Sequence, residues 1–131
     1  MNLFDPPPRD RVPERIVCLT EEPTEILYAL GEEDRIVGIS AYTVRPPQAA
    51  QKPVVSAFIG GSVEKIAALR PDLCIGFSDI QGKLARELIE AGLQVLILNQ
   101  RSLREICEVV LTIGRLVDRG ERARELVDGY V

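Results

Sequence analysis

Two adjacent carboxylates, Glu21 and Glu22, are the first residues along the chain that could do chemistry. Such a pair could serve as a general acid and base, but neighbouring acids in a loop more often face solvent or the positive end of a helix. Asp79 is the third candidate acid. The chain contains no histidine, which excludes Ser-His-Asp triads, Cys-His dyads and histidine metal sites. We therefore expect that the protein is not an enzyme.

The cysteines Cys18, Cys74 and Cys107 offer no second route to catalysis. Each lies in an apolar stretch, and their odd number and wide spacing fit neither a disulfide framework nor a zinc knuckle. We expect buried free thiols and no metal site. No glycine-rich phosphate motif precedes Glu21, and two acids there would repel a pyrophosphate, so no cofactor is predicted.

Strands and helices that alternate along the chain must position these residues. Four short apolar runs predict strands, and four segments of helical period predict helices. The predicted strands are residues 15–20, 35–40, 73–77 and 94–98, and the predicted helices are 23–30, 63–69, 79–91 and the segment after 102. Because helical crossovers join parallel strands, the predicted fold class is α/β. We expect a single small doubly wound, Rossmann-like lobe, with a mainly parallel four-stranded sheet and helices on both faces.

Local signals define the ends of the predicted helices. Gly31 and Gly92 follow two of them as stop signals, and Ser102 with Glu105 forms a capping box at the start of the last long helix. That helix is expected to turn six residues inward. They are Leu103, Ile106, Cys107, Val110, Ile113 and Val117.

Ligands of such sheets bind outside the carboxyl ends of the strands, so the residues just past each strand are the candidates. They are Thr20, Glu21 and Glu22; Ala41, Tyr42 and Thr43; Ser78 and Asp79; and Asn99, Gln100 and Arg101, with Phe58 in the long loop at the same edge. Tyr42 lies in a polar, proline-rich loop with no core to join, so we expect it to contact a ligand. The ligand-binding residues that we predict are Tyr42, Phe58, Glu21, Glu22, Ser78 and Asp79.

Composition limits the partners. The chain has 131 residues, 46% of them hydrophobic, and a net charge of -4, which is typical of one globular domain. Nucleic acid is not an expected partner because no block of lysine and arginine is present. Residues 1–14 predict an extended proline-rich arm without a secretory signal, so the sequence as written predicts a cytoplasmic protein. If the sequence is part of an exported protein, we expect a periplasmic or cell-surface location instead.

Three motifs carry a resemblance to a known family. They are Thr24-Glu25-Ile26-Leu27, Asp34-Arg35-Ile36-Val37-Gly38 and Leu69-Arg70-Pro71-Asp72-Leu73. In this order they resemble the first lobe of the vitamin B12 and ferric-siderophore class of ABC-transporter substrate-binding proteins, and the match covers nearly everything from Arg15 onward. The resemblance implies a lobe at residues 15–119, with residues 120–131 as a C-terminal helix or the start of a helix that connects two lobes.

The resemblance also implies roles for particular residues. Tyr42 and Phe58 stand where cobalamin-binding members place aromatic rings against the corrinoid. Glu64 stands where the first lobe offers a carboxylate to an arginine of the permease, a partner that requires export. Glu21 and Glu22 count against an anionic ferric siderophore, which favours Arg or Lys around it, so a corrinoid ranks ahead of an iron chelate.

An alternative function remains open. The family binds its ligands between two lobes, and a single lobe leaves much of a ligand in water. The chain could instead be a protein-interaction or dimerisation lobe of a cytoplasmic relative with no transport role. Its amphipathic last segment, with Leu126 and Val127, would then pack against another chain, and a homodimer could rebuild the cleft.

Overall fold

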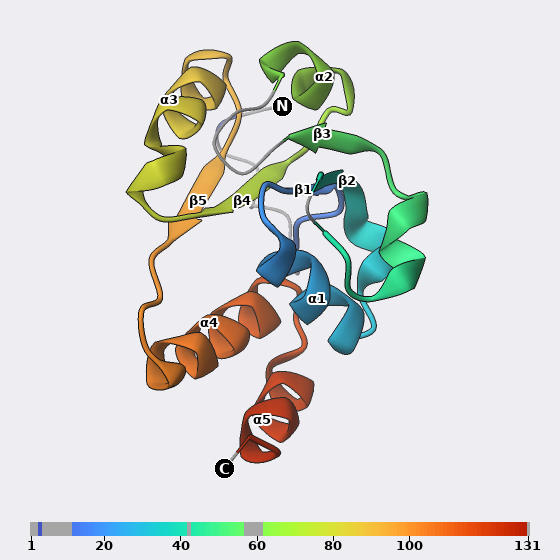
Figure 1. The fold of residues 1–131 in the computed structure, drawn as a ribbon, viewed down its shortest axis with the longest axis vertical. Helices are drawn as coiled ribbons and strands as arrows, with labels where there is room; N and C mark the ends of the chain where they lie inside the picture. Colours follow the sequence, from blue (N-terminus) through green and yellow to red (C-terminus); the bar gives the residue numbers. More distant parts are fainter. Residues whose placement is uncertain (1–2, 4–11, 42, 57–61, 131) are drawn as a thin grey trace.

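A computed structural model describes residue 3 and residues 12–41, 43–56 and 62–130. Within these ranges, strands and helices alternate as shown in Figure 1. In chain order the elements are β1 (Ile16–Cys18), α1 (Glu21–Ala29), β2 (Ile36–Ser40), β3 (Val54–Ser56), α2 (Val63–Ala68), β4 (Leu73–Phe77), α3 (Gly82–Glu90), β5 (Val95–Leu98), α4 (Leu103–Leu116) and α5 (Gly120–Asp128). Short 3-10 turns at Glu33–Arg35, Pro47–Gln51 and Asp79–Gln81 join some of them.

The strands form one parallel sheet in the order β3-β2-β1-β4-β5. This arrangement confirms the predicted doubly wound α/β class. The sheet has five strands in the described residues where the sequence predicted four. The additional strand, β3, is three residues long and lies inside the proline-rich loop, too short for a periodic pattern to reveal it.

Alternating side chains of the strands build a core on each face of the sheet. Ile16 and Cys18 pack with α1, α4 and α5, whereas Val17 and Leu19 pack with α2 and α3. Figure 1 shows the same division, with α2 and α3 on one side of the sheet and α1, α4 and α5 on the other. Successive residues of a strand point to opposite faces, so a continuous apolar run such as 16–19 must be covered on both.

The predicted caps are confirmed. Gly31 and Gly92 adopt left-handed backbone angles, with φ of 76° and 90°, and each follows the C-cap residue of its helix, α1 or α3. Glycine reaches this region without steric cost, which is why it ends helices. At α4, Ser102 Oγ accepts a hydrogen bond from the Glu105 amide at 3.1 Å and donates one to Glu105 Oε1 at 3.2 Å.

Two helix predictions are corrected. The segment 79–91 begins as the 3-10 turn Asp79–Gln81 before α3 starts. In α4, Val110 is buried as expected, but Leu103 is 69% exposed and Ile106 is 36% exposed. Helical period shows which face of α4 is apolar but not how far its neighbours extend, and the cover over this face is incomplete at the first turns.

The cysteines are free thiols, as predicted. Cys18 and Cys74 are buried, and Cys107 is half-buried. Burial raises the pKa of Cys18 to about 12 and that of Cys74 to about 11, so neither is a thiolate at neutral pH. Among the residues with described positions, no cluster of Cys, Asp or Glu could hold a metal ion. No helix in those ranges is long and apolar enough to cross a membrane.

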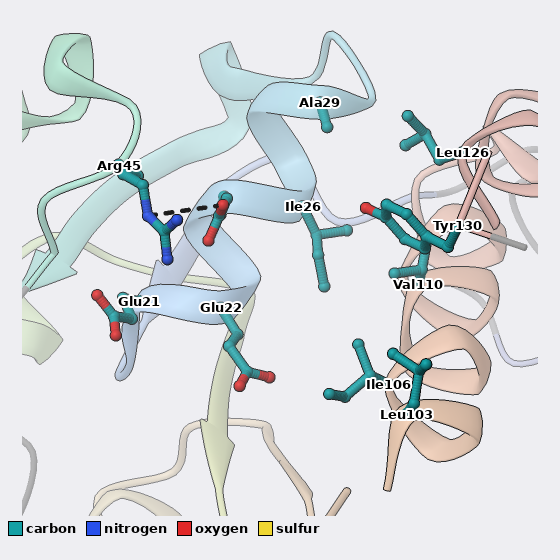
Figure 2. A pocket seen from close by; sticks show the side chains of 11 residues that line it. Glu21, Glu22, Ile26, Ala29, Arg45, Leu103, Ile106, Val110, Leu126 and Tyr130 are labelled. Atoms are coloured by element: carbon teal, nitrogen blue, oxygen red, sulfur yellow. Dashed lines mark ion pairs between the residues drawn. The ribbon is translucent and has the colours of Figure 1, made fainter.

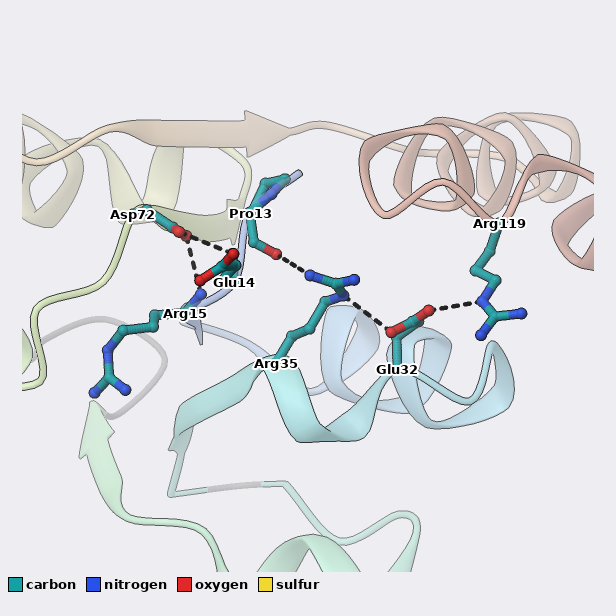
Figure 3. Close-up of polar contacts among 7 residues, drawn as sticks. All are labelled: Pro13, Glu14, Arg15, Glu32, Arg35, Asp72 and Arg119. Carbon is teal, nitrogen blue, oxygen red and sulfur yellow. Dashed lines mark hydrogen bonds and ion pairs between the residues drawn. The ribbon is translucent and has the colours of Figure 1, made fainter. Parts of the chain in front are cut away.

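Polar contacts at the amino ends of the strands join the segment before β1 and the turn after α4 to the rest of the lobe, as Figure 3 shows. Glu32 receives hydrogen bonds from Arg119 at 2.6 Å and from Arg35 at 2.9 Å, and Arg35 also donates to the Pro13 carbonyl at 2.8 Å. Asp72 accepts the backbone amide of Glu14 at 2.8 Å. Glu32 therefore connects the segment before β1 with the turn between α4 and α5.

The titration of Glu32 gives a test of this connection. Burial raises the pKa of its carboxyl group, but the hydrogen bonds from Arg119 and Arg35 outweigh burial and hold the pKa below its ordinary value of 4.5. A lowered pKa in the folded state stabilises the protein above pH 4.5, and this stabilisation disappears as the pH falls through the folded-state pKa.

We therefore expect Glu32→Gln to lower the free energy of unfolding at pH 7 by about 1–2 kcal/mol, because charge-assisted hydrogen bonds are lost. The deficit should shrink as the pH falls below 4.5. Urea denaturation across this range measures it, with Glu121→Gln on the exposed surface of α5 as the control. An equal deficit at neutral and acid pH would contradict the role of the charge.

Candidate functional site

The strand order reverses between β1 and β4. These two strands are neighbours in the sheet, but the helices that follow them lie on opposite faces of it. From β1 the chain enters α1 on one face, and from β4 it turns toward α3 on the other. In doubly wound sheets the crevice at this reversal is where ligands bind. The structure brings Glu21, Glu22, Ser78 and Asp79, all predicted as site residues, to this one edge.

The side chain of Gln81 bridges β1 and β4 at the point where their pairing ends. Its Nε2 donates to the Leu19 carbonyl at 3.0 Å, and its Oε1 accepts from the Phe77 amide at 2.8 Å. Gln81 is fully buried. A Cβ at Gly76 would lie 2.5 Å from Gln81 Oε1, so only glycine leaves room for this bridge.

Ser78 shapes the turn after β4. Its backbone has a φ of 62°, its Oγ accepts from the Ile80 amide at 3.2 Å, and its own amide donates to the Leu98 carbonyl at 2.7 Å. Ser78 is 1% exposed, whereas the neighbouring Asp79 is exposed. A direct ligand contact by Ser78 stays a prediction, and its observed contacts hold the turn that presents Asp79.

A second glutamine completes the edge. Gln100, just past β5, donates from its Nε2 to Glu22 Oε2 and is 8% exposed. Arg101 lies 3.7 Å from Asp79 Oδ1 and donates to Asn99 Oδ1 at 3.1 Å. The segments that follow β1, β4 and β5 thus meet through polar side chains at the carboxyl edge.

Tyr42 and Phe58 lie outside the described residues, so their predicted contacts with a ligand stay predictions. Gln81 was missed because it falls in a segment of helical period, where a polar residue predicts exposure. Gln100 was placed at the rim by its position after a strand, but nothing in the sequence indicated its contact with Glu22, which is 78 residues away.

An apolar groove of about 390 Å³ opens beside this edge, between α1, α4 and α5. In Figure 2 the side chains of Leu103, Ile106 and Tyr130 lie opposite Ile26 of α1. Glu21, Glu22 and Glu25 line its α1 side, and Arg45 lies 3.9 Å from Glu25. The groove is therefore apolar in its floor and acidic along one rim.

A parallel α/β lobe with polar residues gathered at a strand-order reversal has the arrangement in which doubly wound sheets bind ligands. The model of the periplasmic binding protein family matches residues 16–131, and the chain belongs to this family.

Comparisons with individual proteins agree with this family assignment. The chain is 28% identical over 116 residues to a vitamin B12-binding protein of Pectobacterium atrosepticum, covering 86% of this chain and 42% of that protein. It superimposes on the periplasmic vitamin B12-binding protein BtuF of Vibrio cholerae with a TM-score of 0.81 and 28% identity, over 90% of this chain and 47% of the other. A periplasmic haem-binding protein of Pseudomonas aeruginosa gives 0.83 and 28%, over 91% and 43%. The chain thus spans less than half the length of these proteins.

The Gln81 bridge can be tested directly. We expect Gln81→Leu to lower the free energy of unfolding by about 2–3 kcal/mol, because two buried hydrogen bonds are lost while the side-chain volume is nearly kept. Chemical denaturation measures this loss. Gln94→Leu, the same change at an exposed position, should shift stability by less than about 0.5 kcal/mol. Equal effects at the two positions would contradict the account.

Proposed function

We propose that the carboxyl edge of this lobe forms one side of a binding site for a metal-bearing ligand, with a corrinoid ranked first and an iron chelate second. The observation that carries the proposal is the gathering of Glu21, Glu22, Asp79 and Gln100 at the reversal between β1 and β4. Membership of the periplasmic binding protein family, with B12- and haem-binding proteins among its similar structures, supports it.

Aromatic rings supply the apolar part of the proposed site. Tyr42 and Phe58 follow β2 and β3 in the sequence, and aromatic faces hold a large flat ring at little cost in side-chain entropy. In this proposal the rings contact the macrocycle and the polar edge contacts its substituents. The site binds and releases its ligand and does no chemistry on it.

Glu64 is proposed as a contact for a transporter permease. It lies exposed in the first turn of α2, and no ion pair joins it to another residue within the described ranges. A solvent-exposed carboxylate at this position can meet a partner's arginine without losing an internal contact. This role places the working protein outside the cytoplasmic membrane, where the similar structures are named as periplasmic.

One lobe buries only part of a ligand, so we expect saturable but weak binding of cobalamin. Tyr42→Ala and Phe58→Ala should each weaken it about tenfold, the usual cost of removing an aromatic anchor. Visible absorption and calorimetric titrations with cobalamin and with a ferric siderophore measure this. Ile89→Ala, which removes an apolar side chain that is 58% exposed near the end of α3, is the control and should bind as the unmodified chain does. Absence of heat and of a spectral change with both ligands would contradict the proposal.

The second candidate function is contact with a second copy of this chain across the groove. Its observation is the exposed apolar surface of Leu103 and Ile106, which the helical pattern predicted to be buried. A two-fold interface needs both complementary surfaces on one copy. Here Leu103 and Ile106 of α4 and Ile26 of α1 line opposite sides of the groove, so the apolar side chains of one copy can cover those of the other.

Sedimentation velocity separates the two functions. A second copy on the groove predicts that the mass rises toward a dimer with concentration, and that Leu103→Glu returns the chain to a monomer because it buries a charge in an apolar contact. Ile89→Glu on α3, which changes an isoleucine that is 58% exposed, should leave the equilibrium unaltered. A monomer at every concentration would exclude this function.

A further inference from the structure

The pairing of Glu22 with Gln100 fixes which hydrogen-bonding groups the edge offers. An ionised carboxylate only accepts hydrogen bonds, so Gln100 must direct its amide nitrogen toward Glu22. Its other polar atom, Oε1, is then left as an acceptor. In the described part of the chain this oxygen is buried and has no hydrogen-bond partner, and the hydroxyl of Thr20, a residue 5% exposed, is in the same state.

A buried acceptor without a donor is an unfinished polar network. Native proteins usually satisfy such an atom through protein, water or a ligand, and a donor group that reaches the edge would complete this one. Thr20 follows β1 and Gln100 follows β5, so two segments each contribute a polar atom without a hydrogen-bond partner to the same carboxyl edge of the sheet. The edge therefore favours a ligand that donates hydrogen bonds.

Charge at the edge favours the same kind of ligand. The segments that follow β1, β4 and β5 are all described, and they contain three carboxylates and one guanidinium. The carboxylates are those of Glu21, Glu22 and Asp79, and the guanidinium is that of Arg101. A carboxylate on a ligand would therefore meet a net negative charge in these three segments, and the one guanidinium among them already faces Asp79 and Asn99.

We infer that this edge selects macrocycles that carry primary amides and rejects those that carry carboxylates, which means corrinoids over haem. This inference rests on the proposed function and refines it. Corrinoid rings bear peripheral carboxamides whose N–H groups can donate to Glu22 and Gln100, whereas haem bears two propionates that are negative at neutral pH. The chain is similar in structure to both a B12-binding and a haem-binding protein, so similarity alone does not discriminate between the two ligands. The residues of this chain must do so.

Two corrinoids that share the ring and the cobalt but differ in these peripheral groups provide the test. Dicyanocobinamide carries amides, and dicyanocobyrinic acid carries carboxylates on the same ring and cobalt. We expect the intact chain to bind dicyanocobinamide at least about tenfold more tightly in visible-absorption titrations at neutral pH, with haem as weak as the acid. The gap should narrow as salt is raised, because charge repulsion is screened.

Two variants separate charge from hydrogen bonding. Glu22→Gln removes one carboxylate and should narrow the gap between the two corrinoids, chiefly by improving binding of the acid. Gln100→Leu keeps the charge of Glu22 but removes the unpaired oxygen, so it should weaken dicyanocobinamide and leave rejection of the acid in place. Glu90→Gln, which makes the same change of charge at the end of α3, should alter neither affinity.

The outcomes distinguish the two levels of the proposal. Equal or tighter binding of dicyanocobyrinic acid or haem by the intact chain would overturn the selection while leaving a macrocycle site in place. Failure of all three compounds to bind would overturn the proposed function and the selection together. Because the comparison of ligands uses the unmodified chain, a variant that fails to fold does not remove the test.

Discussion

The hydrogen bonds of the Gln81 amide to the Leu19 carbonyl and the Phe77 amide are the contact on which the rest of the site depends. β1 and β4 are the two strands from which the chain departs to opposite faces, and their last pair is Cys18 with Ile75. Beyond that pair the Leu19 amide donates to the Ile75 carbonyl at 2.8 Å, and the buried side chain of Gln81 extends the connection to Phe77. This side chain also requires glycine at position 76, which ties the sequence of β4 to the geometry of the turn that follows.

The other polar contacts of the carboxyl edge lie on either side of the Gln81 bridge. The turn at Ser78 is fixed by its contact with the Leu98 carbonyl, and Asp79 is thereby presented to solvent near Arg101. On the other side of the bridge, Glu22 is held by Gln100. The fold therefore places acceptors from three separate segments at one edge, and the opposite end of the sheet carries the Glu32 network that connects the segments before β1 and after α4.

The sequence predicted the fold class because its signals are local: apolar runs, stop glycines and the Ser102 cap each act within a few residues. The sequence did not reveal β3, which has three residues. It also predicted that Leu103 is buried, which is wrong because the exposure of Leu103 depends on where a neighbouring helix ends. Of the candidate site, the ends of the predicted strands were enough to place Glu21, Glu22, Ser78 and Asp79 at one edge of the sheet, where the structure has them. The contacts of Gln81 and Gln100 join residues 62 and 78 positions apart, and no local pattern encodes such pairs.

The most direct test of the carboxyl-edge site is a ¹⁵N–¹H correlation spectrum of the chain during titration with cyanocobalamin. We expect the largest shift changes on the backbone amides of Thr20, Glu21, Glu22, Asp79 and Gln100. Changes concentrated on Leu103, Ile106 and Tyr130 instead would place the ligand in the groove. That result, or a spectrum that does not change at saturating ligand, would contradict the central claim.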